Sequence, residues 1–459
     1  MILVVFAVIL LVAAVLTGHK RVLGFLAFFG VAAALCFLPA SLQANGVLFS
    51  GMLVNDTVSA FFRFISLGIA GLVILVSMGY RDLEDEEKGE YYFFILTLTL
   101  SMMLATAAKN LMMIYIALES ISLLSYILAG YFKKDMFSSE AGLKYFLFGV
   151  LSTGVTLYGI SLVYGLFGTL DLTAISQQLA AGTIYQPMFL AAFLLVLVGF
   201  GFKCSLVPFH MWTPDVYQGA PTPVAAFFSV GPKAVGFAFL LRVFLMTIPS
   251  ALMQPWILIF GVMAILTMTI GNIVAIQQNN VKRLLAYSTI AQAGYILIGL
   301  TAATILGMKA VLFYIFVYAV MNLGAFGVVV AVCNAVKGEN IEDLAGLYKR
   351  SPFLAVVLLL SFLSLAGIPP LAGFMAKFFV FAAAIEQGLI GLVIVAALNS
   401  VVALYYYARV IKFAFLHEPK DSAVVAQSPS LIVVLGLISA VIVVLGIWPH
   451  PLMNWPIVF

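Results

Sequence analysis

Four ionisable residues stand inside long apolar stretches of the sequence. Lys203 lies in GFKCSLVPFHMWTPDVYQGAPTPV (201–224), which also holds four prolines, while Glu119 lies in MMIYIALESISLLSY, Lys233 in SVGPKAVGF and Lys377 in LAGIPPLAGFMAKFFVF. A charge at the centre of a membrane span costs roughly 2.5–3.5 kcal/mol, so the four together cost about 10–14 kcal/mol before any partner is found. A cost of this size indicates a function, and proton exchange is the chemistry that amines and a carboxylate share.

The prolines point to the same places. Pro208 supplies no N–H to the carbonyl of Cys204, and the pair Pro369–Pro370 likewise frees the carbonyls of Leu365 and Ala366. In hydrocarbon, such groups are tolerated only where protein or a water-filled cavity satisfies them. We therefore predict two polar, hydrated helix breaks.

Each predicted break has a lysine nearby, Lys203 five residues before one and Lys377 seven residues after the other. Desolvation favours the neutral amine of a buried lysine and a nearby carboxylate favours its ammonium form. Movement of Glu119 would therefore capture or release a proton. His210 follows the first break and is a candidate relay because its unperturbed pKa is near 6.5, with an ordinary hydrogen-bonded histidine as the alternative.

Static ion pairs are the alternative for the lysines and for Glu119. Three lysines facing a single carboxylate leave a surplus of charge that a purely structural network does not explain. Asp215 is interpreted as a structural residue that ends a half-helix at the inner surface. The acidic loop RDLEDEEKGE (81–90) is interpreted as a solvated turn, with a docking surface as its alternative.

Composition identifies the elements that must position these residues. The chain of 459 residues is 64% hydrophobic and 9% charged, whereas soluble domains are roughly 45–50% apolar and about 25% charged. We therefore expect an all-α polytopic membrane protein. Stretches of about 20 predominantly apolar residues give fourteen predicted spans: 1–17, 22–40, 57–78, 91–108, 110–131, 141–166, 187–217, 222–247, 254–276, 283–303, 306–335, 353–384, 388–416 and 430–449.

The seventh and twelfth spans, 187–217 and 353–384, are unusually long and are interrupted by proline. Because the twelfth span comes five positions after the seventh, an odd number, the two cross the membrane in opposite directions. Paired broken helices of this kind indicate inverted repeats with the functional site at the breaks. The predicted organisation is three N-terminal spans (1–90), a first five-helix repeat (91–248), a second inverted five-helix repeat (249–416) and a C-terminal span (417–459).

The first residues lack the basic region and the cleavage site of a signal peptide, so we interpret them as a retained helix.

Basic residues set the predicted orientation of the helices in the membrane. With both termini outside, only Arg63, Lys109, Arg242 and Lys309 lie towards the outer face, as the positive-inside rule requires. The inner loops then collect Lys20, Arg21, Arg81, Lys88, Lys133, Lys134, Lys282, Arg283, Lys337, Lys349, Arg350, Arg409, Lys412 and Lys420.

Other chemistries find little support. Cysteines without paired spacing and scattered histidines argue against a disulfide framework, a haem or a metal site; they are Cys36, Cys204, Cys333, His19, His210, His417 and His450. A net charge of +4, spread along the chain, gives no support for nucleic-acid binding.

Several long motifs, in order, resemble those of a known family. They are FKCSLVPFHMWTPDVYQGAPTPV, GPKAVG, QQNNVKRLLAYSTIAQAGY, FYIFVYAVMNLGAF and LAGIPPLAGFMAKFFVF. Together they cover roughly residues 90 to 420 and resemble the antiporter-like family of respiratory complex I, which is shared with multi-subunit cation/proton antiporters. Within this family, the length and Lys377 are most similar to the chain N branch.

The resemblance implies a proton-translocating membrane subunit of NADH–quinone oxidoreductase. Glu119 resembles the fifth-helix glutamate of the family, and Lys203, Lys233 and Lys377 resemble the lysines of its seventh, eighth and twelfth helices. It implies a lateral chain of proton carriers, with the Glu119–Lys203 pair sensing a neighbouring subunit.

The family likewise implies where the rest of the machinery lies. No cofactor is expected in this chain; NAD, FMN, iron–sulfur clusters and quinone are expected in partner subunits. The expected partners are other membrane subunits of complex I, including further antiporter-like chains, and the lipid bilayer. The expected location is an energy-coupling membrane, in the first place the bacterial inner membrane.

Three alternatives remain open at this stage. The chain could belong to a multi-subunit cation/proton antiporter, which keeps much of the same pattern. A secondary transporter for an organic solute would also use broken helices in inverted repeats, but it needs a substrate pocket. A passive membrane scaffold would hold the same charges in fixed salt bridges.

Overall fold

The computed structural model describes residues 1–16, 21–43, 46–80, 83, 88–182, 186–419, 424–425 and 427–456. Four residues used in the sequence arguments, His19, Lys20, Arg81 and Lys420, lie outside these ranges, as does most of the acidic loop 81–90.

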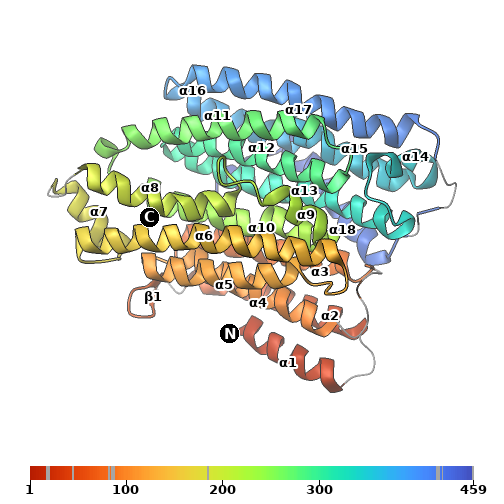
Figure 1. Cartoon of the computed structure of the whole chain (residues 1–459), viewed down its shortest axis with the longest axis horizontal. Coiled ribbons are helices and arrows are strands. Elements are labelled where there is room, and N and C mark those ends of the chain that lie inside the picture. The colour runs from red at the N-terminus through yellow and green to blue at the C-terminus, as the bar shows by residue number, and fades with distance from the viewer. Residues whose placement is uncertain are drawn as a thin grey trace.

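The described chain is a bundle of helices that run roughly along one common axis (Figure 1). The helices of the first half are α1 Ile2–Leu16, α2 Arg21–Gln43, α3 Thr57–Ser77, α4 Lys88–Ala107, α5 Leu111–Ala129, α6 Met136–Phe167, α7 Leu172–Ala180, α8 Gln186–Cys204, α9 Thr213–Gly219 and α10 Thr222–Leu240. Those of the second half are α11 Gln254–Ile276, α12 Val281–Thr301, α13 Ile305–Val336, α14 Leu347–Arg350, α15 Pro352–Ala366, α16 Ala372–Glu386, α17 Ile390–Leu416, α18 Pro429–Ile447 and α19 His450–Met453.

Short elements complete the described chain. The strands β1 Val47–Leu48 and β2 Leu53–Val54 pair antiparallel, with Val47 opposite Val54. A π-helical turn, η1 Leu241–Leu245, extends α10, and two 3₁₀ turns, η2 Ser250–Leu252 and η3 Ile341–Leu344, lie in loops.

Twelve of the described helices are long and apolar enough to cross a membrane, which confirms the all-α polytopic class. The predicted spans 1–17 and 353–384 correspond to shorter helices, since α1, α15 and α16 have 15 residues each. The count of fourteen spans, the inverted relation of the repeats and the domain boundaries therefore stay predictions.

Short polar side chains begin several of the long helices. Asn110 before α5, Asp135 before α6 and Asn280 before α12 each accept a hydrogen bond from a backbone N–H of the first helical turn. This is the usual N-cap arrangement. It explains why these helices start where a polar loop gives way to apolar sequence.

The two predicted helix breaks are present. The helix α8 ends at Cys204 and α9 starts at Thr213, while α15 ends at Ala366 and α16 starts at Ala372. The first residue after α8 and the first after α15 have a left-handed backbone conformation, with φ 56° at Ser205 and 89° at Gly367. Left-handed residues commonly end helices, so each break combines a helix stop with a proline that cannot continue the helix.

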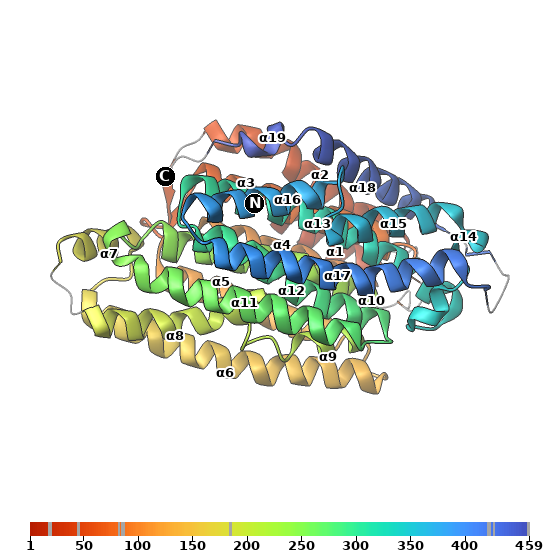
Figure 2. The same cartoon turned by 90° about the horizontal axis from the view of Figure 1, so that it is seen from above.

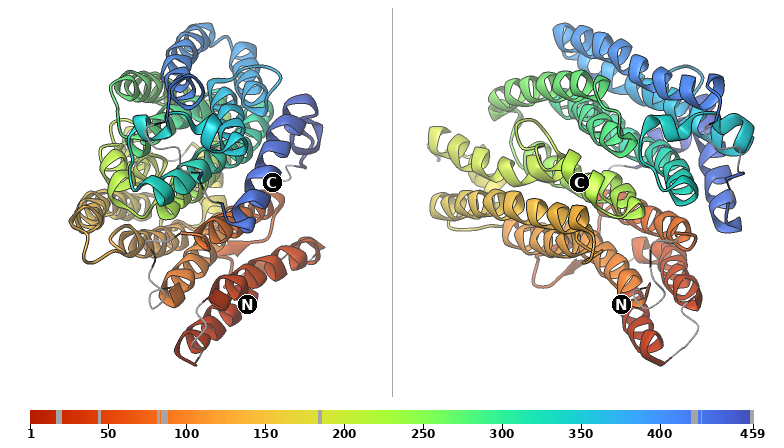
Figure 3. Two further views of the ribbon diagram at one scale, coloured as in Figure 1. Left: turned by 90° about the vertical axis from the view of Figure 1, so that its right-hand side faces the viewer. Right: turned by 45° about the vertical axis from the view of Figure 1, so that its right-hand side comes forward.

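The centre of the bundle is formed by α10, α12 and α13. Every residue of α10 is buried, and α12 and α13 are almost as enclosed. Seen from above, α6 and α8 lie along one edge and α2, α18 and α19 towards the other (Figure 2). The end-on view shows the red N-terminal helices beside the dark blue C-terminal helix (Figure 3), where Ser430 of α18 donates to the carbonyl of Leu75 in α3 at 3.1 Å.

Candidate functional site at the helix breaks

The three lysines predicted to carry chemistry are buried in or beside the two breaks. Lys203 lies in the last turn of α8, Lys233 in the middle of α10 and Lys377 in the second turn of α16. Their exposed fractions are 2%, 2% and 5%. A buried ammonium group is unfavourable unless polar partners compensate for its lost hydration, so the partners of each amine decide what the site can do.

At the first break, a lysine binds the carbonyl that proline sets free. The Nζ of Lys233 donates to the carbonyl oxygen of Cys204 at 3.0 Å, and Cys204 is the residue four positions before Pro208. Since proline has no N–H for this carbonyl, the side chain from α10 replaces the missing helical hydrogen bond. A protein group therefore satisfies the freed carbonyl of Cys204, and the predicted hydration of the break stays a prediction.

At the second break, two carbonyls are set free, and each accepts a hydrogen bond from a different side chain. Lys377 donates to the carbonyl of Ala366 at 2.8 Å and to the hydroxyl of Ser400 at 3.1 Å. Its Nζ also lies 4.4 Å from the ring centre of Tyr295, a favourable cation–π distance. The other freed carbonyl, that of Leu365, accepts from the side-chain amide of Gln292 in α12 at 2.9 Å.

Sequence reasoning missed Gln292. Its signal was a lone amide in the middle of an apolar span, IAQAGY, and such residues in membranes face protein or water. The residue is fully buried. Besides donating to Leu365, it accepts a hydrogen bond from the hydroxyl of Tyr314 in α13 at 2.6 Å, so it joins three helices at the second break.

Polar residues of α13 lie between Ser229 of α10 and Gln292 of α12. Ser229 lies one turn before Lys233 in α10; its hydroxyl accepts from Asn322 at 2.6 Å and its carbonyl from Tyr318 at 3.0 Å. Tyr314, Tyr318 and Asn322 follow at every fourth position of α13, so they share one face of that helix. This face reaches from Ser229 to Gln292, across the centre of the bundle.

Glu119 and Lys203 are not in contact. Among the described residues, neither Lys203 Nζ nor Glu119 Oε1 has a hydrogen-bond partner. The Nζ of Lys203 instead lies 5.5 Å from the ring centre of Tyr145 and 5.6 Å from that of Phe202. The ion pair that the resemblance implies is therefore open in this structure.

His210 lies where the sequence analysis placed it, in the segment between α8 and α9. It is 8% exposed, and its Nδ1 has no hydrogen-bond partner among the described residues. The side chain of Cys36 is exposed, that of Cys204 is buried and that of Cys333 is partly buried. Within the described ranges, no three His, Cys, Asp or Glu side chains are placed to hold a metal ion.

Ion pairs hold α9 at the face predicted to be internal. Asp215 accepts from Lys144 of α6 and from Arg283 of α12, both at 2.6 Å. Arg283 also donates to Gln218 at 3.0 Å. Asp215 lies in the first turn of α9 and ties this half-helix to two long helices; its role is structural, but it does not end the half-helix as the sequence analysis expected.

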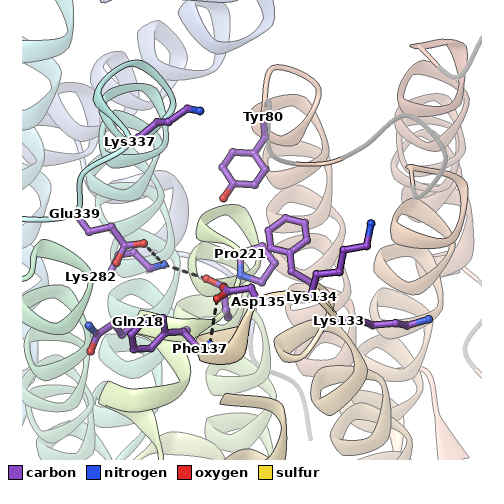
Figure 4. Close-up of a pocket in the computed structure, with 13 residues that line it drawn as sticks. Tyr80, Lys133, Lys134, Asp135, Phe137, Gln218, Pro221, Lys282, Lys337 and Glu339 are labelled. Atoms are coloured by element: carbon purple, nitrogen blue, oxygen red, sulfur yellow. Dashed lines mark hydrogen bonds and ion pairs between the residues drawn. The ribbon is translucent and has the colours of Figure 1, made fainter. Parts of the chain in front are cut away.

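A cavity of about 800 Å³ opens at the same face, next to the start of α10. Figure 4 shows Lys282 and Glu339 pointing towards each other at its wall, where they form an ion pair at 2.8 Å. Lys134 and Lys337 also line the cavity, and their side chains extend away from that pair (Figure 4). The cavity lining therefore carries more basic than acidic side chains.

The chain is similar to proteins of one family over nearly its whole length. The model of the transmembrane family of NADH:quinone oxidoreductases and Mrp antiporters matches residues 108–403. The NADH-quinone oxidoreductase subunit N of Anaeromyxobacter sp. is 41% identical over 465 residues, covering 94% of this chain and 88% of that protein. The subunit N of Moorella thermoacetica is 41% identical over 449 residues, covering 97% of this chain and 94% of that protein.

A solved structure agrees with these relatives. A chain of respiratory complex I from Thermus thermophilus, determined with bound aureothin, matches with a TM-score of 0.84 at 33% identity, covering 98% of this chain and 97% of that chain. The described helices include twelve that can span a membrane. This chain is therefore a multi-pass membrane protein and belongs to the NADH:quinone oxidoreductase/Mrp antiporter transmembrane family.

Proposed function

We propose that this chain is a proton-translocating membrane subunit of NADH–quinone oxidoreductase. One observation carries the proposal: at both proline breaks, a buried lysine binds a carbonyl that proline sets free. A lysine held in this way keeps a polar partner whether it is charged or neutral, because the amine can still donate. The lysine at each break can therefore gain and lose a proton while its hydrogen bond to the freed carbonyl is kept.

The polar residues between the breaks support a lateral path. We infer that it starts at Glu119 and Lys203, continues through Lys233 and ends at Lys377. Between the last two, polar side chains of α10, α12 and α13 line the proposed route: Asn322 and Tyr318 donate to Ser229, and Tyr314 donates to Gln292. His210 is an additional relay candidate at the first break.

The switch is the distance between Glu119 and Lys203. A carboxylate close to a desolvated ammonium stabilises its charge, and a carboxylate that moves away leaves the charge desolvated, so the proton is released. The open arrangement, in which Lys203 faces Tyr145 and Phe202, corresponds to the releasing state. A conformational change in a neighbouring subunit would close the pair and start the next cycle.

The energy for this switch comes from outside the chain. We infer partner subunits that hold NAD, FMN, iron–sulfur clusters and quinone, with further antiporter-like chains beside this one in the membrane. The family match and the relatives named as NADH-quinone oxidoreductase subunits support this assignment. We further infer a location in the bacterial inner membrane with both termini outside.

A second candidate is a subunit of a multi-subunit cation/proton antiporter, because the matching family model covers Mrp antiporters as well. Purification of the tagged chain from native membranes separates the two. Flavin and iron–sulfur spectra together with NADH oxidation that travel with the chain support the first candidate. Other membrane chains without redox centres support the second.

The test of the proposed role is Lys203→Met in the assembled complex. This change keeps the bulk of the side chain and removes its charge. We expect fewer protons pumped per electron, measured as acidification of proteoliposomes during NADH oxidation. Lys412→Met, at an exposed position of α17, is the matched control; a full ratio in Lys203→Met would overturn the proposal.

A further inference from the structure

Lys377, at the end of the proposed path, has no charged neighbour. The charge of Glu119 acts on Lys203, whereas among the described residues no charged group acts on Lys377, which is buried. The amine of Lys377 meets a backbone carbonyl, the hydroxyl of Ser400 and the ring of Tyr295. These three groups therefore decide how well the site holds a proton.

The aromatic ring distinguishes the two protonation states of the lysine most sharply. The carbonyl and the hydroxyl accept a hydrogen bond from the neutral amine as well as from the ammonium, although more strongly from the ammonium. The negative face of an aromatic ring attracts only the cation, and the attraction is larger where the cation is desolvated. The Nζ of Lys377 lies 4.4 Å from the ring centre of Tyr295, so the ring favours the charged form.

Hydrogen bonds anchor the hydroxyl end of this tyrosine. The hydroxyl of Tyr295 accepts from the Nδ2 of Asn272 in α11 at 3.3 Å, and Ser400 lies beside it. Asn272 is fully buried; it also donates to both oxygens of Asn399 in α17 at 3.2 Å and accepts from the hydroxyl of Tyr406 at 3.0 Å. Asn272 thus links α11, α12 and α17 around the ring that meets Lys377.

Close packing of α11 against α12 fixes the same arrangement. Gly271 precedes Asn272, and Gly294 precedes Tyr295. A Cβ added at Gly271 would lie 2.7 Å from a backbone nitrogen of α12, and one added at Gly294 would lie 2.8 Å from a backbone nitrogen of α11. The two helices approach this closely because both positions are glycine, and the approach brings Asn272 to Tyr295.

The other titratable groups near the ring are phenols. Tyr314 of α13 and Tyr406 and Tyr407 of α17 interact with Tyr295, and phenols ordinarily ionise near pH 10. Glu386 lies exposed at the end of α16, and α15 and α18, which also pack against α16, carry no ionisable side chain. The charged residues of α12, α13 and α17 lie within about two turns of a helix end: Lys282, Arg283, Lys309, Arg409 and Lys412.

We propose that Tyr295 is a positioning residue whose ring, anchored by Asn272, stabilises the ammonium form of Lys377 in place of a carboxylate. The amine of Lys377 takes up one proton from the path and becomes an ammonium, and it becomes an amine again when it passes that proton on. The ring holds the charged form between these two steps. Without the ring, Lys377 loses its proton at a lower pH.

This inference rests on the proposed function, and both are tested by the number of protons pumped per electron, measured across a range of pH with the assembled complex in proteoliposomes. The ratio should fall where Lys377 loses its proton. We expect Tyr295→Leu, which removes the ring, to move this fall to lower pH by roughly one unit. We expect Tyr295→Phe, which keeps the ring within the same packing, to leave the fall at its original pH.

Two further variants calibrate the measurement. Lys377→Met is the reference for a lost proton carrier, with a low ratio at every pH. Tyr91→Leu is the matched control, because Tyr91 is a buried tyrosine of α4 whose hydroxyl pairs with Ser77 at 2.8 Å. We expect Tyr91→Leu to keep the original pH profile.

A series of fluorinated phenylalanines at position 295 is an independent test. Each ring fluorine withdraws electron density from the ring face and weakens its attraction for a cation, while the size of the side chain hardly changes. We expect the fall in the pumping ratio to move to lower pH stepwise as one, two and three fluorines are added. A structural role of Tyr295 alone predicts no dependence on the number of fluorines.

The outcomes separate the two proposals. With Lys377→Met defective, an unshifted profile in Tyr295→Leu overturns the role of Tyr295 and leaves the proposed function standing, and equal shifts in Tyr295→Leu and Tyr295→Phe overturn the role of the ring. A full ratio in Lys377→Met overturns the proposed function and this inference with it. If Tyr295→Leu fails to assemble, the fluorinated series decides, and an unchanged profile across that series refutes the inference.

Discussion

The substitution Gln292→Leu separates two roles of one residue, support of the second break and continuity of the proposed path. It removes the donor to the carbonyl of Leu365 at 2.9 Å and the acceptor for the hydroxyl of Tyr314 at 2.6 Å. Both groups stay buried because Leu365 and Tyr314 are fully enclosed.

The cost follows from these two lost hydrogen bonds. A buried group left without its partner costs about 1–3 kcal/mol, so the pair costs about 2–6 kcal/mol. At about 1.4 kcal/mol per factor of ten, the intact second break is disfavoured roughly 30-fold to 10⁴-fold relative to an opened one. We expect a lower melting temperature of the purified complex and a lower ratio of protons pumped per electron.

The companion variant Tyr314→Phe isolates the path. It keeps the ring and leaves the bond from Gln292 to Leu365 intact, so only one buried group loses its partner; we expect a cost of about 1–3 kcal/mol, smaller than that of Gln292→Leu, but the same loss of pumping. Gln178→Leu is the control, because Gln178 also donates to a carbonyl, that of Phe167, outside the proposed path. Full pumping by Tyr314→Phe, with Gln292→Leu defective, would show that Gln292 only supports the break and would refute the path through Tyr314.

Two further predictions concern packing and charge. In Gly373→Ala, the added Cβ would lie 1.8 Å from the carbonyl oxygen of Ser364, so α15 and α16 must move apart at a cost of about 1–3 kcal/mol. We expect this variant to have a lower melting temperature, whereas the control Gly391→Ala, whose added Cβ has no atom within 4 Å, keeps the original value. Equal melting temperatures of the two variants would contradict the close packing at Gly373. Asp56→Asn keeps the cap of α3 but removes the anionic partner of Arg242, whose side chain is 4% exposed and whose guanidinium lies 2.8 Å from the carboxylate of Asp56. We expect about 3 kcal/mol of destabilisation. An unchanged melting temperature would show that the ion pair contributes nothing.

The breaks could be predicted because their cause is local. A proline removes the donor for the carbonyl four residues earlier, so the sequence alone names Cys204, Leu365 and Ala366. It does not name their partners, because Lys233 and Gln292 come from other helices, 29 and 73 residues away from the carbonyls they bind. Nothing in the spacing of apolar residues predicts which side chain of a neighbouring helix reaches a given carbonyl.

The same limit applies to the distance between Glu119 and Lys203. Both were predicted to be buried and ionisable, because their surroundings in the sequence are apolar. Their separation depends on how α5, α6 and α8 pack, and the packing places the Nζ of Lys203 beside the ring of Tyr145 of α6. The sequence gives no signal for the position of Tyr145 because aromatic residues are common in membrane spans.

By itself, the sequence determined the membrane class, the two broken helices and the four mid-membrane ionisable residues, since hydropathy, proline and charge act within one segment. Only the tertiary structure decided that Lys233 and Lys377 bind the freed carbonyls, that α13 carries a polar face between them and that the Glu119–Lys203 pair is open. The physical reason is that a hydrogen bond depends on a few tenths of an ångström between atoms of different helices. That distance is set by the packing of the whole bundle and cannot be predicted from any single segment of the sequence.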